Sequence, residues 1–153
     1  MTEEQTLKQQ LIDYCRAEID ARVTGLSDAL TAITTARDGE TKSSAGDKFE
    51  TGRAMMQMEE AKLNGQLAEV LTVRRTLDQL RADATPDRIA AGSLVATNRG
   101  NYFLGVGLGK VKLAGRIFFC TSLESPVGQY LLGKQSGDVF TFNELDFQVL
   151  GMV

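Results

Sequence analysis

Histidine and tryptophan are absent from the 153-residue sequence. Without histidine, the chain has no Ser-His or Cys-His nucleophile pair and no histidine-ligated zinc site. Any proton transfer therefore depends on carboxylates, lysine, tyrosine, cysteine or groups that a partner supplies. The sequence thus excludes hydrolases and zinc enzymes that rely on an imidazole.

Cysteine is scarce as well, because only Cys15 and Cys120 occur, far apart and without a CxxC spacing. We interpret them as buried or free thiols of a reduced compartment, without a metal or redox role. The sequence also lacks a run of 18 or more apolar residues, and its first residues have neither the basic nor the apolar segment of a secretory signal. We therefore expect a cytoplasmic location and no association with a membrane.

Positive charge is in slight deficit. The chain has 17 Lys and Arg residues against 20 Asp and Glu residues, which gives a net charge of −3. A general nucleic-acid binder would be expected to carry a basic face. We therefore expect no direct sequence-specific binding to nucleic acid.

The composition changes near Pro86. Eight of the ten aromatic residues and ten of the fifteen glycines lie after it, whereas the first 84 residues carry 15 acidic and 11 basic side chains. The first part is rich in helix formers and the second in β-formers and turn residues. The sequence therefore predicts an α+β protein with a helical part at residues 1–84 and a β-rich domain at residues 88–153.

The helical part carries two apolar stripes. One steps by three or four residues, and the other repeats every seven. Because neither helix could bury its stripe alone, we expect an antiparallel coiled-coil hairpin, with a first helix at about residues 4–36 that is roughly 50 Å long. The first stripe comprises Ile12, Cys15, Ile19, Val23, Leu26, Leu30 and Ile33, and the second comprises Phe49, Met56, Leu63, Val70 and Leu77, with Leu67, Val73 and Leu80 alongside.

The connection at about residues 34–48 forms the tip of the predicted hairpin. It contains no large apolar residue, so it is not expected to pack into a core. Gly39 and Gly46 can adopt left-handed conformations, and the Ser and Thr residues can cap helix ends. A solvated turn is the simplest interpretation.

The second half contains short β-forming segments separated by glycine. We expect a mostly antiparallel sheet crossed by one short helix, which Ser125 caps, Pro126 opens and Gly133 ends. The glycine-rich segment 105–110 lacks the spacing of a nucleotide-binding loop, and we expect a hairpin turn there. The predicted strands are residues 93–97, 102–106, 111–113, 117–121, 139–142 and 147–150.

The segment Ser125-Pro-Val-Gly-Gln-Tyr-Leu-Leu-Gly-Lys134, followed by Ser136-Gly-Asp-Val139, resembles the C-terminal signature of Gre-type transcription factors. Gly92-Ser-Leu-Val95 resembles the start of the first strand of the same domain. The resemblance implies a C-terminal domain of FKBP-like fold that docks on bacterial RNA polymerase near its secondary channel. Ser125, Pro126, Gly133 and Lys134 are the residues of the signature that we assign to partner binding by this resemblance.

The resemblance also implies that the hairpin tip enters the channel and that acidic tip residues help to hold a magnesium ion at the polymerase active site. The polymerase would then cleave its own backtracked RNA, so the chain is not expected to be an enzyme itself. Mg²⁺ suits this role, because it is often held by one or two carboxylates together with phosphates. The candidate ligands are Asp38, Glu40, Asp47 and Glu50.

The tip departs from the family pattern. If Phe49 replaces the tyrosine of the family's tip motif, the two acidic positions fall on Lys42 and Ala45. Asp47 and Glu50 have the correct spacing of three residues but lie five residues later, where carboxylates also complement a helix dipole.

Three alternatives to a cleavage factor therefore stay open. The first is a non-cleaving regulator that binds the same channel. The second is a coiled-coil adaptor that pairs with another helix or with a second copy of the chain. The third is a small FKBP-like isomerase or chaperone, although fold alone does not establish activity. For the leading interpretation we expect a monomer with no cofactor of its own.

Overall fold

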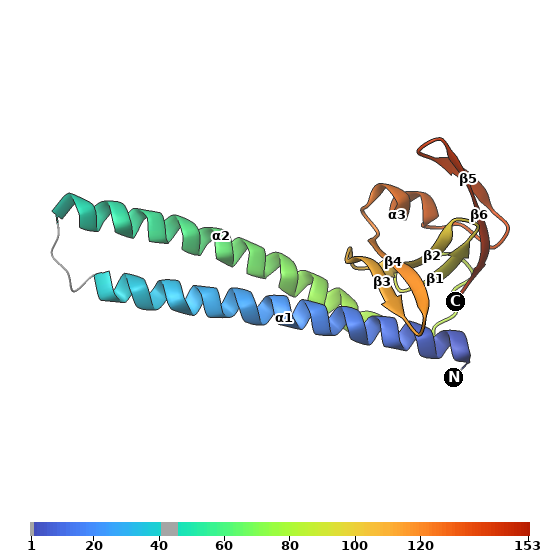
Figure 1. The fold of residues 1–153 in the computed structure, drawn as a ribbon, viewed down its shortest axis with the longest axis horizontal. Helices are drawn as coiled ribbons and strands as arrows, with labels where there is room; N and C mark the ends of the chain where they lie inside the picture. The colour runs from blue at the N-terminus through green and yellow to red at the C-terminus, as the bar shows by residue number, and fades with distance from the viewer. Residues whose placement is uncertain (1, 41–45) are drawn as a thin grey trace. The chain divides into compact units, whose positions relative to one another are not determined.

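The computed structural model describes residues 2–40 and 46–153, and the side chains of residue 40 and residues 46–49 lie outside the described part. Two long helices precede a sheet domain with one short helix (Figure 1), which confirms the predicted α+β class. No helix in these described ranges is long and apolar enough to cross a membrane. The elements are α1 (Glu3–Glu40), α2 (Gly46–Gln79), β1 (Leu94–Thr97), β2 (Gly100–Gly105), β3 (Gly109–Leu113), β4 (Arg116–Ser122), α3 (Pro126–Leu131), β5 (Val139–Phe142) and β6 (Leu145–Met152).

The chain divides into two compact units at positions other than the expected boundary near Pro86. One unit combines Met1–Arg16 with Thr76–Val153, and the other is Ala17–Arg75. The first turns of α1 and the last turn of α2 therefore belong with the strands. The physical reason is burial, because Leu11 and Leu77 are both fully buried.

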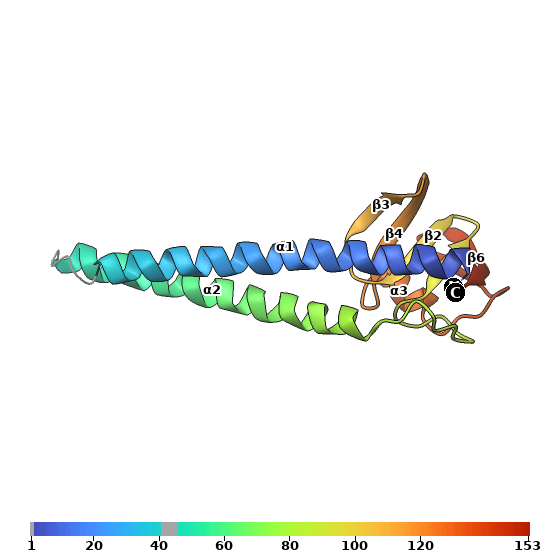
Figure 2. The ribbon, with the colours of Figure 1, turned by 90° about the horizontal axis from the view of Figure 1, so that it is seen from below.

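In the unit Ala17–Arg75, α1 and α2 run side by side in opposite directions (Figures 1 and 2). Ion pairs between Asp20 and Arg74 and between Arg37 and Glu60 join the two helices. The predicted stripes lie between them, where Ile19 and Leu63 are buried. The remaining described stripe residues are half-buried, namely Val23, Leu26, Leu30, Ile33, Met56, Leu67, Val70 and Val73.

The helices extend further into the predicted tip than the sequence indicated. Helix α1 continues to Glu40 and α2 already begins at Gly46, although residues 34–48 were expected to form the connection. Backbone hydrogen bonds within a helix need no apolar side chains, so a polar segment next to a long helix can continue it. Residues 41–45 lie outside the described part of the chain.

The six strands form one sheet in the order β3-β4-β2-β1-β6-β5. All neighbouring pairs are antiparallel except β2 and β4, which are parallel. The hairpin turn expected at residues 105–110 was therefore wrong, because β4 lies between β2 and β3 and the glycine-rich segment is a crossover. Glycines favour a turn equally in a hairpin and in a crossover, so this segment alone did not distinguish them.

Two tight turns close the hairpins β3–β4 and β5–β6. In both turns the two central residues have positive φ angles: 51° and 75° at Ala114 and Gly115, and 51° and 63° at Asn143 and Glu144. This is the backbone geometry that suits the twist of two-residue hairpins. The last strand is longer than the predicted residues 147–150, because β6 runs from Leu145 to Met152.

Both faces of the sheet are covered. On one face, Phe103 and Phe118 are fully buried together with Leu11 and Cys15 from the first turns of α1. The opposite face carries a separate core under α3. That core comprises Ile89, Val95, Leu104, Leu131 and Val149, with Tyr102, Leu123, Val127, Phe140 and Met152 packed at its edge.

Lys8 is a charged residue in the first of these cores. Its side chain is 1% exposed, and its Nζ donates a hydrogen bond of 2.9 Å to the carbonyl of Ala84. Burial lowers the pKa of Lys8, and the nearby Asp83 carboxylate acts in the opposite direction. The lysine therefore joins α1 to the segment after α2 at the cost of desolvating its charge.

We predict that this burial makes stability depend on alkaline pH. The pKa of Lys8 is below its ordinary value of 10.5 in the folded state, so the unfolded chain binds more protons between these two values. The free energy of unfolding should therefore rise as the pH increases from the lowered pKa toward 10.5. Urea unfolding of Lys8→Met should lack this rise, whereas Lys110→Met, which removes an exposed lysine, should retain it. Equal slopes in all three proteins would contradict the prediction.

Candidate functional site

The segment Ser125–Lys134, which carries the family resemblance, builds α3 through a defined start. Ser125 is the N-cap in an extended conformation, and its Oγ accepts a hydrogen bond of 3.1 Å from the Gly128 amide. The same Oγ donates to the carbonyl of Ser122 at 2.8 Å. Pro126 is exposed at the first helical position, where a missing N–H costs nothing. The capped start that the sequence predicted is confirmed.

Gly128 allows α3 to approach the end of β4 closely. A Cβ atom built at this position would lie 2.1 Å from the Ser122 carbonyl oxygen and 2.8 Å from the Ser125 Oγ. No side chain other than hydrogen fits between these atoms. The glycine of the Ser-Pro-Val-Gly sequence is therefore required by this contact, a role that the sequence analysis did not assign.

The end of α3 is fixed by backbone hydrogen bonds to the segment before β1. The Gly133 amide donates to the Ile89 carbonyl at 2.8 Å, and the Ile89 amide donates to the Lys134 carbonyl at 2.9 Å. Gly133 has a φ of 83°, which glycine adopts without strain. Arg88 adds a bond of 3.1 Å from Nη1 to the Gly133 carbonyl. Gly133 thus positions the backbone, and Lys134 follows directly after it.

A partly exposed aromatic surface extends from α3 onto β5 and is defined here by Tyr130, Lys134, Phe140 and Phe142. Tyr130 is 45% exposed and stacks on Phe140 with ring centroids 5.7 Å apart. Lys134 places its Nζ 5.9 Å from the centre of the Phe140 ring. Aromatic residues are enriched at protein-binding surfaces, and a lysine above an aromatic ring adds a cation–π contact.

Most residues of the sequence signature differ from those that form the aromatic surface, and the two groups have different roles. Of the four residues assigned to partner binding, three shape α3: Ser125 through its side-chain oxygen, and Pro126 and Gly133 through the backbone. Lys134 alone belongs to the aromatic surface. Tyr130 was not identified as a candidate. One signal was available: the predicted helix is very short, and such a helix cannot bury all of its apolar residues. Because Leu131 is buried, the adjacent Tyr130 is exposed.

The four candidate acidic residues at the tip are only partly described. Asp38 and Glu50 are exposed, on the last turn of α1 and the first turns of α2. The side chains of Glu40 and Asp47 lie outside the described part of the structure, as do Lys42 and Ala45. Whether the four carboxylates converge therefore stays untested.

The described carboxylates and thiols do not form a metal site by themselves. In residues 2–39 and 50–153, no three Asp, Glu or Cys side chains lie close enough together to hold an ion. Carboxylates such as Asp38 and Glu50 have the oxygen donors that Mg²⁺ prefers. Both are exposed and lie on two different helices.

Cys15 and Cys120 are both buried and not in a disulfide, as the sequence analysis expected. The structure adds that the two thiols meet between α1 and β4. Their hydrogen bond lowers the pKa of Cys120, while burial of this thiol acts in the opposite direction. This contact could not be predicted from the sequence, because the two residues lie on elements that only the tertiary fold brings together.

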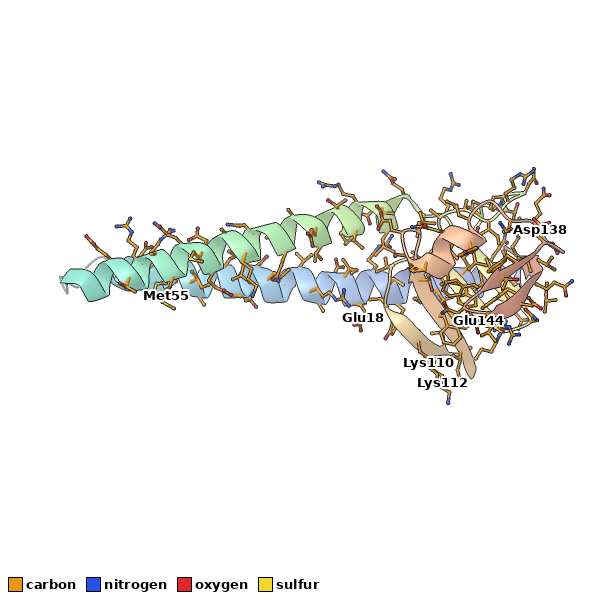
Figure 3. All side chains as sticks on the ribbon, turned by 90° about the horizontal axis from the view of Figure 1, so that it is seen from above. Glu18, Met55, Lys110, Lys112, Asp138 and Glu144 are labelled. Atoms are coloured by element: carbon orange, nitrogen blue, oxygen red, sulfur yellow. The ribbon has the colours of Figure 1, made fainter. Side chains whose placement is uncertain are left out.

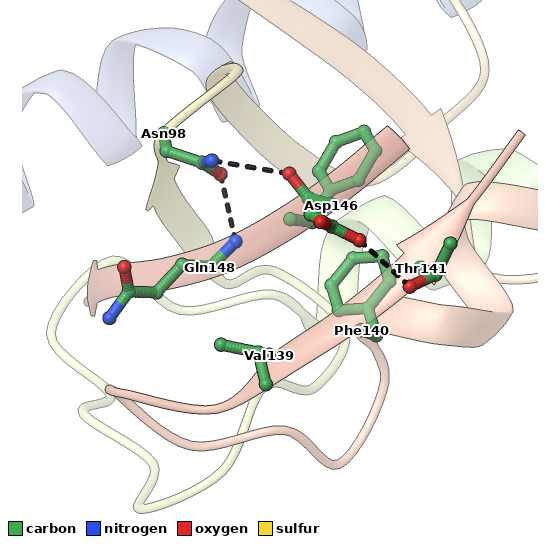
Figure 4. A pocket seen from close by; sticks show the side chains of 7 residues that line it. Asn98, Val139, Phe140, Thr141, Asp146 and Gln148 are labelled. Carbon is green, nitrogen blue, oxygen red and sulfur yellow. Dashed lines mark hydrogen bonds between the residues drawn. The ribbon is translucent and has the colours of Figure 1, made fainter. Parts of the chain in front are cut away.

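A shallow hollow lies on β5 and β6 beside the β1–β2 turn (Figure 4). Most of its polar groups are hydrogen-bonded within the chain. Asn98 donates to the Asp146 carbonyl at 3.2 Å and accepts from the Gln148 amide at 2.8 Å, and Thr141 donates to the Asp146 carboxylate at 3.0 Å. The hollow therefore presents no converging set of unsatisfied groups for a small polar ligand.

Comparison with known proteins gives little further information. No protein-family model matches the sequence, and no curated protein matches it. Among solved structures, the chain is similar to one described as the structure of the transcription factor Gfh1, with 16% identity and a TM-score of 0.36. The similarity covers 90% of this chain and 92% of that chain. A similarity of this size assigns neither a family nor a function.

We predict that Gly128→Ala is strongly destabilising, because the new methyl group would overlap the Ser122 carbonyl. Overpacking of this kind costs typically about 1–3 kcal/mol of unfolding free energy. Gly151→Ala is the matched control, since a Cβ there meets no atom within 4 Å. Urea unfolding of both variants gives the comparison, and similar losses in both would refute the proposed close contact.

Proposed function

We propose that this protein is a Gre-like regulator that binds RNA polymerase near its secondary channel and inserts the tip of its helical hairpin. The observation that carries the proposal is the detailed structure of the segment Ser125–Lys134. Each special residue of this segment has a structural role: Ser125 caps α3, Gly128 permits a close contact and Gly133 adopts a positive φ. The segment built in this way presents Tyr130 and Lys134 on the aromatic surface. We assign this aromatic surface to the contact with polymerase.

The helical hairpin is compatible with insertion into a channel. Helix α1 has 38 residues and is therefore about 57 Å long at 1.5 Å per residue. Arg37 and Glu60 join the two helices toward the tip, so this part of the pair is tied by charge as well as by apolar contact. Residues 34–50 carry four acidic and three basic side chains, and the exposed carboxylates among them include Asp38 and Glu50.

The role of the tip has two versions. In the first, Asp47 and Glu50, which lie three residues apart in the sequence, help polymerase to hold a magnesium ion during RNA cleavage. In the second, Lys42 and Ala45 stand at the acidic positions of the family motif and the factor does not support cleavage. In both versions the chemistry belongs to polymerase, and the chain acts as a cytoplasmic monomer that makes no sequence-specific contact with nucleic acid.

A coiled-coil adaptor is the second candidate, and one observation favours it. Met55 and Met58 on α2 are 66% and 74% exposed. Met55 projects from the helix (Figure 3), and flexible methionine side chains suit adaptable contacts. An adaptor would use these residues to pair with a further helix. A dimeric mass in solution that becomes monomeric in Met55→Gln/Met58→Gln would favour the adaptor over the polymerase-binding monomer.

The polymerase proposal predicts micromolar or tighter binding to core bacterial RNA polymerase through the aromatic surface. The double substitution Tyr130→Ala/Lys134→Glu should weaken binding at least about tenfold, since it removes an aromatic anchor and reverses a charge. Gln129→Ala, on the same helix but outside the aromatic surface, should bind as the wild type does. Biosensor titration measures all three, and absence of wild-type binding would reject the proposal.

Cleavage of backtracked RNA separates the two versions of the tip. Stalled complexes with Mg²⁺ and the wild-type protein should release short 3′ fragments faster than polymerase alone if Asp47 and Glu50 assist the metal. Asp47→Ala/Glu50→Ala should then lose the stimulation while it keeps polymerase binding, and Glu59→Ala, an exposed acid further along α2, should keep both. Binding without any stimulation by the wild type would assign the non-cleaving version.

A further inference from the structure

The two edges of the sheet differ in how they meet solvent. Strand β3 forms one edge, and its exposed Lys110 and Lys112 project into solvent (Figure 3). Lysines on an edge strand discourage the addition of another strand. Strand β5 forms the other edge, and its sequence Val139-Phe-Thr-Phe142 contains no charged residue and no proline. One edge is thus protected against pairing and the other is not.

The backbone of β5 presents hydrogen-bonding groups to the open side. Next to β5, the Gly137 amide donates to the Val149 carbonyl at 2.7 Å, and the Val149 amide donates to the Asp138 carbonyl at 2.9 Å. Because bonding alternates along an antiparallel pair, Phe140 bonds to its partner Phe147 on β6, whereas the N–H and C=O groups of Val139 and Thr141 point away from β6. A strand added there would find two donors and two acceptors.

The two faces of β5 determine which kinds of side chain an added strand would need. Phe140 and Phe142 lie on the aromatic surface, so alternate residues of the added strand would meet aromatic rings. On the opposite face, Val139 and Thr141 border the polar hollow of Asn98 and Gln148 (Figure 4). An extended segment with apolar and polar residues in alternation would match both faces.

Charge near this edge is mostly negative. Residues 135–153 contain Asp138, Glu144 and Asp146 but no lysine or arginine, and the first two stand just before and just after β5. The nearby cations, Arg99 and Lys134, lie over the aromatic rings of Phe147 and Phe140 at 5.7 and 5.9 Å. The ends of the strand therefore complement basic residues on a partner.

We propose that the free edge of β5 binds an extended segment of a partner protein that alternates apolar and polar residues between flanking lysines or arginines. The segment adds a seventh strand to the sheet through the backbone of Val139 and Thr141. The interaction is non-covalent. This binding site goes beyond the proposed function, because it does not depend on RNA polymerase.

The probe for this site is a synthetic peptide, Lys-Lys-Val-Thr-Val-Thr-Lys-Lys, titrated into isotope-labelled protein. In two-dimensional NMR spectra we expect saturable shifts of the Val139 and Thr141 amides and slower exchange of both with solvent. A peptide with the same core and glutamates in place of the lysines should bind several-fold more weakly, in line with the modest strength of exposed charge pairs. Equal affinity of the two peptides would overturn the assigned charge preference.

Two variants test the edge itself. Thr141→Pro removes one outward N–H, and Val139→Lys adds the kind of charge that protects β3, so each should reduce peptide binding at least about tenfold. Lys110→Gln on the opposite edge is the matched control and should bind normally, and the NMR spectra report whether each variant is folded. Unchanged binding by the folded variants, or no shift at β5 in the wild type, would refute the site. Concentration-dependent shifts of β5 without peptide would show that a second copy of the chain, not a foreign segment, occupies the edge.

Discussion

Burial of the first turns of α1 against the sheet is the interaction on which the β-containing unit depends. Leu11 and Cys15 lie on the face that carries Phe103 and Phe118, and all four side chains are almost entirely buried. Without this cover, one side of the sheet would expose two aromatic rings to water. The requirement also explains why the compact unit draws residues from both ends of the helical hairpin, and it leaves the other face free to receive α3.

Features encoded within a few residues could be predicted from the sequence. The cap at Ser125, the proline after it and the glycine that ends α3 form a local pattern, and the apolar stripes gave the two long helices. The parallel pairing of β2 and β4 could not be inferred, because it joins segments whose intervening glycines suit a hairpin equally well. The contact between Cys15 and Cys120, and the pairing of Lys8 with the Ala84 carbonyl, likewise depend on residues far apart in the chain.

At the candidate site, too, local features could be predicted and features that depend on distant residues could not. The signature residues identified the position of α3 because glycine, proline and serine control the backbone, but they did not identify the side chains that α3 presents. Tyr130 gains its significance from stacking on Phe140, which lies on a strand that comes after the helix in the chain. At the tip, sequence spacing selected acidic residues without fixing their arrangement in space. The sequence is therefore more informative about how the surface is built than about which atoms it offers.

The paired thiols give this fold an internal reporter of its own motions. Cys15 and Cys120 are the only cysteines of the chain, and both are shielded from solvent between α1 and β4. A thiol-reactive dye can reach them only after these elements separate, so its rate of attachment measures how often the first turns of the helix detach. Cys15 and Cys120 have no evident chemical role, yet they make the opening of this part of the molecule measurable without an engineered label.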